Sequence, residues 1–338
     1  MRVDEPYLYI IMFSNRSLPF IVSATHWARL GELEALYRIK TTTARHQCQP
    51  PPAARTLSSW GVQNDSLTPY SSSMKMIAWN CQGAGNEMFS AHAYELHRRH
   101  RPEMLIIIEP RISDDRAQAV IDSLPYTHSY RVDPTGYSGG IWLLWNENSY
   151  FMVEIITRSE HSIHALVKVH SSSTSFLFTA VYAPPQFYKR KSFWDYLQNL
   201  ALNIALPWVL MGDFNDMTSD DEKLGGLPVN RSRIAAFRNC IDICGLIDLG
   251  FHGPRFTWTN KSPVWQTTIK ERLDRGLSNA EWLMLFPSTQ IHHLPRVKSD
   301  HCLILLDTNP FERKSSKPFR FEQMWLIDPT FSSLIQNS

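Results

Sequence analysis

The chain has 338 residues, of which 34 are Lys or Arg and 32 are Asp or Glu, so its formal net charge is +2 with the 13 His neutral. This near balance excludes a histone-like polycation, and a nucleic-acid partner would have to be held by a local basic patch. With 43% hydrophobic and 20% charged residues, the composition is that of a globular protein with room for one large domain or two smaller ones.

Cysteine usage and hydropathy narrow the class of protein further. The five Cys residues are odd in number and form no Cys-x-x-Cys pair, so we predict neither a disulfide framework nor a four-thiolate zinc site, and we expect a reducing compartment. No run of about 18 uninterrupted apolar residues is present, so we predict no membrane span. The apolar run at 7–13 follows Asp4 and Glu5, where a signal peptide requires positive charge. We therefore expect an intracellular protein.

The first part of the chain differs in composition from the rest. A helix is possible at 24–40, but residues 41–73 are rich in Pro, Ser, Thr and Gln and have no helical or strand period, which predicts a linker or disorder. We therefore expect residues 1–73 to be a largely disordered extension outside the folded domain. After about residue 309, the density of charged residues and Pro rises again.

From residue 74 onward, short apolar runs alternate with amphipathic segments. The runs at 139–182 suggest an antiparallel meander, and strands alternate with helices on either side of it, which predicts a mixed α/β layered sandwich. In chain order, the predicted strands are 75–79, 104–108, 139–145, 151–156, 163–169, 175–182, 208–211 and 302–306, and the predicted helices are 87–99, 114–123, 189–203 and 231–244.

Several apolar runs stop at a polar side chain. Active sites of layered α/β proteins lie where strand ends open into loops, so we expect these side chains to lie together. Each alone has a structural interpretation: a Glu can cap a nearby helix, and a lone His is more often a hydrogen-bonded core residue. Together they supply hard oxygen ligands and one acid–base group, as magnesium-assisted phosphodiester hydrolysis requires. The residues are Asn80, Gln82, Glu109, Tyr182, Asp213, Asn215, Asp300 and His301.

The order of these motifs resembles that of the endonuclease/exonuclease/phosphatase superfamily. Within it, the sequence is most similar to the apurinic-type endonuclease domain of plant non-LTR (LINE-type) retrotransposon polyproteins. The resemblance covers residues 74–308, while 309–338 resemble the connector toward a reverse transcriptase, a module that we expect in the parent element and not in this chain. The motifs are Asn80-x-Gln82-Gly83, Glu109, Ser138-Gly139-Gly140, Val181-Tyr182-Ala183-Pro184, Gly212-Asp213-Phe214-Asn215, Arg272-Leu273-Asp274-Arg275 and Ser299-Asp300-His301.

The resemblance implies a fold, an activity and a partner. The fold would be a DNase I-like α/β four-layer sandwich, with two mixed β-sheets packed face to face and helices outside. The activity would be magnesium-dependent nicking of one DNA strand by phosphodiester hydrolysis, leaving a 3′ hydroxyl, and we expect a monomer with DNA as its partner. Action in the nucleus would follow only from this substrate, because the sequence has no run of five basic residues.

The resemblance also implies a role for each residue of the set. Glu109 and Asn80 would hold Mg²⁺, or Mn²⁺ in its place. Asp213 would position or deprotonate the attacking water, and His301, paired with Asp274, would be a protonated donor to the phosphate. The substrate would be contacted by Asn215, Tyr182 and Gln82. Asp300 would lie near the metal or the leaving group.

One departure from the family pattern bears on the substrate. Abasic-site repair members carry an acidic residue where this chain has Gln82, so its absence weakens a second metal position and argues against repair. Two alternatives stay open: an inactive retroelement remnant with at most nucleic-acid binding, and a phosphatase of the same superfamily. Basic residues at 189–191 could contact backbone phosphates, although such charges more often face solvent.

Overall fold

The structure is a computed structural model that describes residues 73–134, 139–147, 151–169 and 174–310. The predicted helix at 24–40 lies outside the described residues, as do the predicted linker at 41–73 except for its last residue and the predicted connector at 309–338 except for its first two. No helix in the described ranges is long and apolar enough to cross a membrane.

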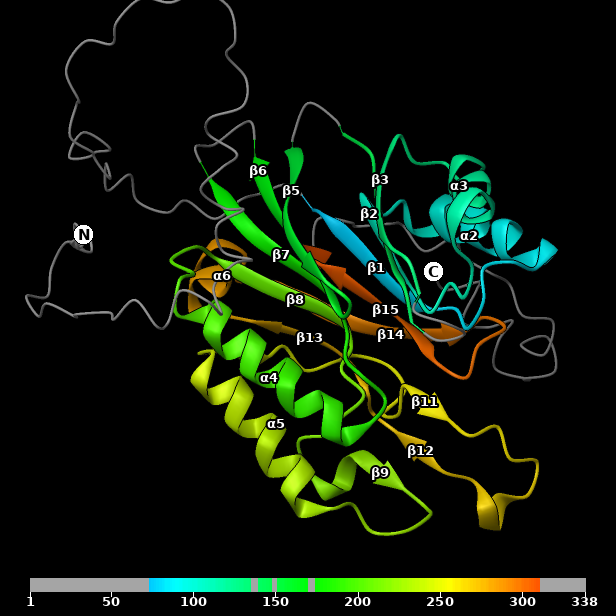
Figure 1. The fold of residues 1–338 in the computed structure, drawn as a ribbon, viewed down its shortest axis with the longest axis vertical. Helices are drawn as coiled ribbons and strands as arrows, with labels where there is room; N and C mark the ends of the chain where they lie inside the picture. The colour runs from blue at the N-terminus through cyan, green and yellow to red at the C-terminus, as the bar shows by residue number, and fades with distance from the viewer. Residues whose placement is uncertain (1–72, 135–138, 148–150, 170–173, 311–338) are drawn as a thin grey trace, which may run out of the picture. The chain divides into compact units, whose positions relative to one another are not determined.

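Two mixed six-stranded sheets and one small sheet make up the strands of the described part of the chain (Figure 1). The first sheet has the order β14 (Gln290–Arg296), β15 (Cys302–Asp307), β1 (Lys75–Asn80), β2 (Met104–Ile108), β4 (Ile141–Trp145), β3 (His128–Val132). The second has the order β10 (Ile247–Asp248), β13 (Asp274–Ser278), β8 (Trp208–Asp213), β7 (Ser175–Tyr182), β6 (Ser162–Val169), β5 (Phe151–Ser159). The small sheet contains β11 (Trp258–Thr259), β12 (Lys270–Glu271) and β9 (Lys223–Leu224).

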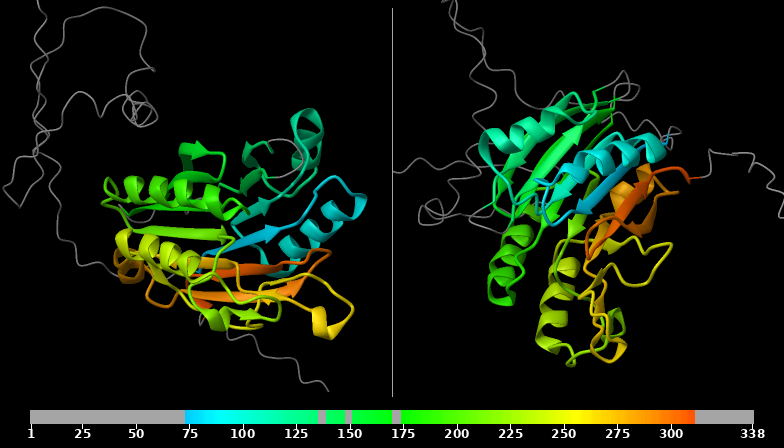
Figure 2. Two further views of the ribbon diagram at one scale, coloured as in Figure 1. Left: turned by 60° about the horizontal axis from the view of Figure 1, so that its bottom comes forward. Right: turned by 90° about the vertical axis from the view of Figure 1, so that its right-hand side faces the viewer.

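Helices cover the outer faces of both large sheets (Figure 2). The helices α2 (Glu87–His100) and α3 (Asp114–Asp122) pack on the first sheet, and α4 (Phe187–Ala201) and α5 (Arg231–Ile243) pack on the second. The remaining helical segments are α6 (Ala280–Leu285), η3 (Asp220–Glu222) and η4 (Trp265–Thr267). This arrangement confirms the predicted four-layer α/β sandwich.

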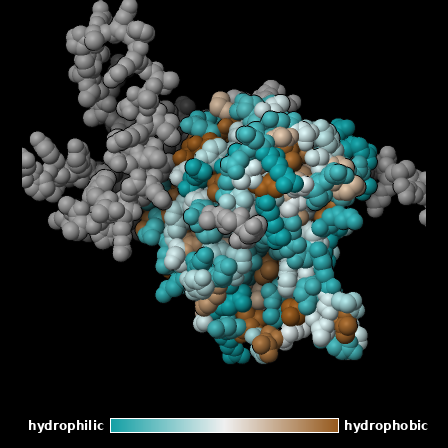
Figure 3. Space-filling model, turned by 45° about the vertical axis from the view of Figure 1, so that its right-hand side comes forward, coloured by the Kyte–Doolittle hydropathy of each residue, from teal (hydrophilic) through white to brown (hydrophobic). Residues whose placement is uncertain are grey.

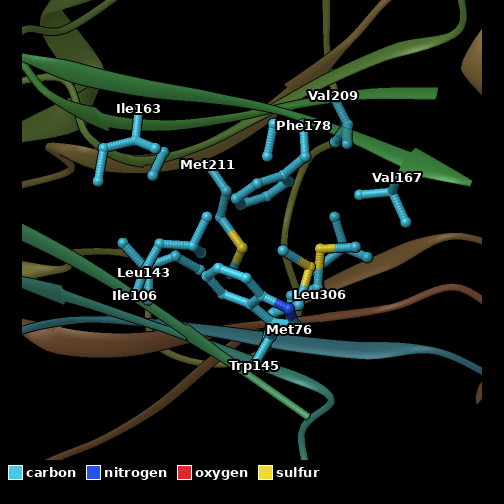
Figure 4. Packing of buried hydrophobic residues seen from close by; sticks show 14 of the residues in the cluster. Met76, Ile106, Leu143, Trp145, Ile163, Val167, Phe178, Val209, Met211 and Leu306 are labelled. Carbon is cyan, nitrogen blue, oxygen red and sulfur yellow. The ribbon is translucent and has the colours of Figure 1, made fainter. Parts of the chain in front are cut away.

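The largest core cluster lies between the two sheets (Figure 4). Met76 and Ile106 of the first sheet face Phe178 and Met211 of the second, and all four are fully buried. The alternate residues of the same strands, such as Ile77, pack on the outer helices. Because both faces of these strands are buried, their sequences are continuous apolar runs rather than an alternating pattern. The face in Figure 3 is mostly hydrophilic, with scattered apolar side chains.

The structure corrects the predicted meander. β4 pairs with β2 and β3 in the first sheet, and only β5, β6 and β7 form the antiparallel meander, in the second sheet. Each predicted run is a strand, but the chain passes from one sheet to the other between Trp145 and Phe151, and a run of apolar residues does not reveal its pairing partner. β3, β13 and β14 were missed because polar residues interrupt their apolar pattern.

A buried ion network explains how a polar strand such as β13 fits inside the protein. Arg275 is fully buried and its Nη1 donates to Glu222 Oε1 at 2.7 Å and to Asp248 Oδ2 at 2.9 Å. Arg272 Nη1 donates to Glu222 Oε1 at 2.8 Å, so two cations meet two anions. Burial acts to raise the pKa of Glu222, but the hydrogen bond and charge of Arg275, the hydrogen bond from Thr218 N and the charge of Arg272 together outweigh it and lower the pKa to about 2. This network holds β13, and with it Asp274, in place.

The two ends of the described domain hydrogen-bond to each other. Met74 N donates to Thr308 Oγ1 at 2.8 Å, and Thr308 N donates to Met74 O at 3.0 Å. We therefore predict that a chain shortened to begin at Met74 keeps the melting temperature and the activity of the full chain, as circular dichroism and an activity assay would show. A fall in melting temperature of several degrees would mean that residues 1–73 pack on the domain.

Candidate active site

Strand register brings the predicted site residues to one edge of the two sheets. In parallel β7 and β8, Tyr182 pairs with Asp213, and antiparallel β13 places Asp274 opposite Asp213 as well. In parallel β1 and β2, Asn80 pairs with Ile108, so Glu109 follows directly beside it. The ends of these strands therefore form one site.

Asn80 is the centre of the contacts at this edge. Its Nδ2 lies 3.3 Å from Glu109 Oε1 and 3.0 Å from Asp213 Oδ2, and both carboxylate oxygens accept from it. Because these partners are acceptors, the amide oxygen faces away from them, and Asn80 Oδ1 is buried without a hydrogen-bond partner in the described part of the chain. Such an atom costs free energy unless a ligand satisfies it.

Glu109 is held by two further donors. Tyr182 OH donates to Glu109 Oε1 at 3.0 Å, and Arg111 Nε donates to Oε2 at 3.1 Å. Burial and the carboxylates of Glu109 and Asp213 raise the pKa of Tyr182 well above its usual value, so the phenol keeps its proton. Arg111, whose side chain is 42% exposed, was not anticipated from the sequence.

His301 and Asp274 form a buried pair. His301 Nδ1 donates to Asp274 Oδ2 at 2.9 Å, and Thr257 Oγ1 fixes the adjacent backbone by accepting from Leu273 N at 2.9 Å and from Asp274 N at 3.0 Å. Burial acts to lower the pKa of His301, but Asp274 and then Asp213 outweigh it and raise the pKa to about 9. The imidazole is therefore protonated at neutral pH, and its Nε2 lies 3.8 Å from Asp213 Oδ2.

Asp213 and Asn215 are placed by a tight backbone approach. A Cβ at Gly212 would lie 2.0 Å from Val181 O, so only glycine fits before Asp213. Asn215 N donates to Asp213 Oδ1 at 2.9 Å, and Asn215 Nδ2 donates to Ala183 O at 2.8 Å, which leaves the second amide hydrogen for a ligand. Burial and the Asp274 carboxylate raise the pKa of Asp213 to about 7, although His301 acts to lower it.

The other two predicted residues lie at the margin of the site. Asp300 Oδ2 accepts from Trp258 Nε1 at 3.0 Å, and Asp300 Oδ1 lies 3.9 Å from His301 Nε2. Gln82 is half-buried and, within the described residues, makes no hydrogen bond to the other members of the set. Ser138 of the predicted Ser-Gly-Gly motif lies outside the described residues.

Three residues of the set have a left-handed backbone. Each of Gln82, Glu109 and Asn215 has a φ of 52°. For residues other than glycine this conformation costs about 1 kcal/mol or more, and such residues concentrate at functional sites. These side chains therefore leave the strand ends in directions that an extended backbone would not give.

The possible metal-ligand atoms at this edge suit a divalent cation. Ligand atoms of Asp213, Asp274 and His301 lie within 4.8 Å of one another, a spacing compatible with a bound metal ion, but His301 can be a ligand only in its neutral form. Hard cations such as Mg²⁺ prefer oxygen ligands, which the carboxylates and the unpaired Asn80 Oδ1 supply.

Comparison with known proteins agrees with this architecture. The fold is similar to the endonuclease domain of TRAS1, a telomere-specific non-LTR retrotransposon, with a TM-score of 0.52 and 12% identity over 69% of this chain and 97% of that one. It is also similar to the AP endonuclease LMAP from Leishmania major, with a TM-score of 0.55 and 18% identity over 85% and 99% of the two chains. For a 3′-5′ exonuclease, NExo, from Neisseria meningitidis, the TM-score is 0.52, with 16% identity over 70% and 100%.

At such identities these likenesses show a shared fold, and a search of curated proteins finds no match. The family model described as the Endonuclease/Exonuclease/phosphatase family matches residues 77–301, which is most of the described domain. The chain therefore belongs to the endonuclease/exonuclease/phosphatase family, whose members are hydrolytic nucleases and phosphatases.

Proposed function

We propose that the protein is a magnesium-dependent DNA endonuclease that nicks one strand and leaves a 3′ hydroxyl, with residues 74–308 as the catalytic domain. The observation that carries this proposal is the buried cluster in which Asn80 contacts Glu109, Asp213 and His301 while His301 pairs with Asp274. We also propose descent from a plant LINE-type retrotransposon, on the basis of the motif order and of Gln82.

Glu109 and Asn80 would hold the metal ion. Glu109 offers a carboxylate and Asn80 an unpaired buried oxygen, whereas a protonated His301 has no lone pair free for a metal. When bound, Mg²⁺, or Mn²⁺ in its place, supplies positive charge that stabilises the phosphodiester and the leaving oxygen. Tyr182 gives its only proton to Glu109, so we assign it the role of positioning that carboxylate.

The remaining residues would carry out the hydrolysis. Asp213 accepts a proton from the attacking water, and a pKa near 7 makes its carboxylate basic enough to do so. The water oxygen bonds to phosphorus while the bond from phosphorus to O3′ breaks, and O3′ takes up a proton from solvent, which leaves a 3′ hydroxyl and a 5′ phosphate. His301 Nε2 and the second amide hydrogen of Asn215 donate to the phosphate oxygens. Asp300, whose Oδ1 lies 3.9 Å from His301 Nε2, would be near the metal ion or the leaving oxygen.

The two shifted pKa values predict a bell-shaped dependence of nicking on pH. Asp213 must be ionised to accept a proton, so the rate rises as pH increases through about 7. His301 must be protonated to donate, so the rate falls as pH increases beyond about 9. Initial nicking rates across this range would check both limbs, and a rate that keeps rising above pH 10 would contradict a protonated His301.

The direct test is incubation of purified protein with supercoiled plasmid in Mg²⁺ and in EDTA. We expect open-circular product only with the metal, and extension of the nick by a DNA polymerase would establish the 3′ hydroxyl. A matched pair of duplexes, with and without an abasic site, tests the consequence of Gln82: both should be cut at similar rates, with preference for deformable pyrimidine–purine steps. A hundredfold preference for abasic DNA would favour a repair enzyme, and no cleavage by folded protein would favour an inactive remnant.

A further inference from the structure

A buried carboxylate, Asp216, follows Asn215 in the chain and contacts two arginines. Asp216 and Arg190 are both buried, and Asp216 Oδ2 accepts from Arg190 Nε at 2.9 Å. Arg190 Nη1 also donates to Pro184 O at 2.8 Å, so the hydrogen bonds of this arginine are made inside the protein. Arg233 Nη2 lies 3.3 Å from Asp216 Oδ1, and its side chain is 26% exposed.

The charges of this cluster do not cancel. Asp216 carries one negative charge, which Arg190 neutralises from inside the protein, so the positive charge of Arg233 is left over. Arg233 Nε is buried and has no hydrogen-bond partner among the described residues. Nε is closed to a ligand, but the side chain as a whole is 26% exposed and carries the surplus positive charge, so it is suited to attract an anion.

Arg233 is also next to the proposed reaction centre. Its Nη2 donates to the backbone oxygen of Asn215 at 3.4 Å, and Asn215 is the residue whose free amide hydrogen faces the substrate phosphate in our proposal. Asn230 fixes the first turn of α5, because its Oδ1 accepts from Ser232 N at 2.9 Å. This cap sets the place of Arg233 relative to Asn215.

We propose that Arg233 binds a backbone phosphate adjacent to the scissile one, and that the Asp216–Arg190 pair positions it for this contact. The inference rests on the proposed function and adds to it a specific anchor for the DNA strand. Tyr188, Lys189 and Lys191 are exposed at the start of α4, whereas Arg190 of the same basic run is buried and serves this positioning role.

The test is duplex binding by Arg233→Gln, with Arg238→Gln as the control, because Arg238 is an exposed arginine further along the same helix. Fluorescence anisotropy in EDTA separates DNA binding from metal-dependent cutting. We expect Arg233→Gln to weaken binding about tenfold, as for the loss of a charge-assisted hydrogen bond, and to reduce the slope of log affinity against log salt by about 0.9. Arg238→Gln should change neither quantity.

A scan of single neutral methylphosphonates along the cut strand locates the contact. In the wild type, one position adjacent to the scissile phosphate should weaken binding, and in Arg233→Gln the same position should have no effect. Equal losses in the two arginine variants, or a scan that is unchanged by Arg233→Gln, would overturn the inference.

A wild-type protein that neither binds nor cuts DNA would instead overturn the proposed function itself. If Arg233→Gln fails to fold, Arg233→Lys tests the inference in its place. Lysine keeps the charge and loses the planar donors, so the slope of log affinity against log salt should stay the same while the affinity falls. A full loss of slope in a folded Arg233→Lys protein would contradict the inference.

Discussion

Glu109→Gln is expected to abolish Mg²⁺-dependent nicking, with a loss of roughly a thousandfold or more, while the protein stays folded. The substitution keeps the shape of the side chain, and an amide oxygen can still accept from Asn80 Nδ2 and Tyr182 OH. It removes the negative charge that a hard cation requires. Nicking rates at several Mg²⁺ concentrations, together with Mg²⁺ binding by calorimetry, would measure the effect.

The matched control is Glu281→Gln. Glu281 is an exposed residue in the first turn of α6, which follows β13 at the end opposite to Asp274, so the change removes one charge far from the site. We expect it to leave the nicking rate and Mg²⁺ affinity unchanged. Wild-type nicking by folded Glu109→Gln protein would exclude Glu109 as the metal ligand.

Asp274→Ala and His301→Ala should each reduce the nicking rate by a large factor, and the double variant should be little worse than either single one. The 2.9 Å hydrogen bond makes the two side chains one functional unit, in which Asp274 keeps His301 charged and oriented. The measurement is a double-mutant cycle on initial rates. Losses that multiply would mean that the two residues act independently.

Asp274→Asn separates charge from orientation within this pair. The amide can still accept from His301 Nδ1, but it no longer stabilises the imidazolium, so the pKa of His301 should fall. The alkaline limb of the pH–rate profile should therefore move to lower pH, whereas a purely structural role would lower the rate without moving the limb.

The fold was largely predictable from the sequence because its central strands are buried on both faces. Continuous apolar runs mark β2 and β8 directly, and polar residues at their ends mark the edge where the site lies. The pairing partner of β4 was not predictable, since five apolar residues in a row are compatible with either sheet. β13 was hidden because Arg275, a residue that propensity places at the surface, is buried by its ion pairs.

The site was only partly predictable for a similar reason. The resemblance placed His301 next to Asp274, and the structure puts these two in hydrogen-bond contact. The contacts of Arg111, Thr257 and Trp258 depend on how loops from different strands meet, which no local pattern encodes. Arg233 lies in the predicted helix at 231–244, and no local pattern distinguishes it from the other arginines there; the role that we propose for it depends on the contact that it shares with Arg190 at Asp216.

The left-handed backbone at Glu109 and Asn215 sets the stability of the fold against the chemistry of the site. Glycine at either position would remove this backbone cost, which is about 1 kcal/mol, because it adopts φ of 52° without a steric penalty. The same change would delete the carboxylate or the amide that the site requires. The chain therefore holds the carboxylate and the amide at the strand ends at a cost in backbone free energy, so that stability and the proposed activity make opposite demands on these two positions.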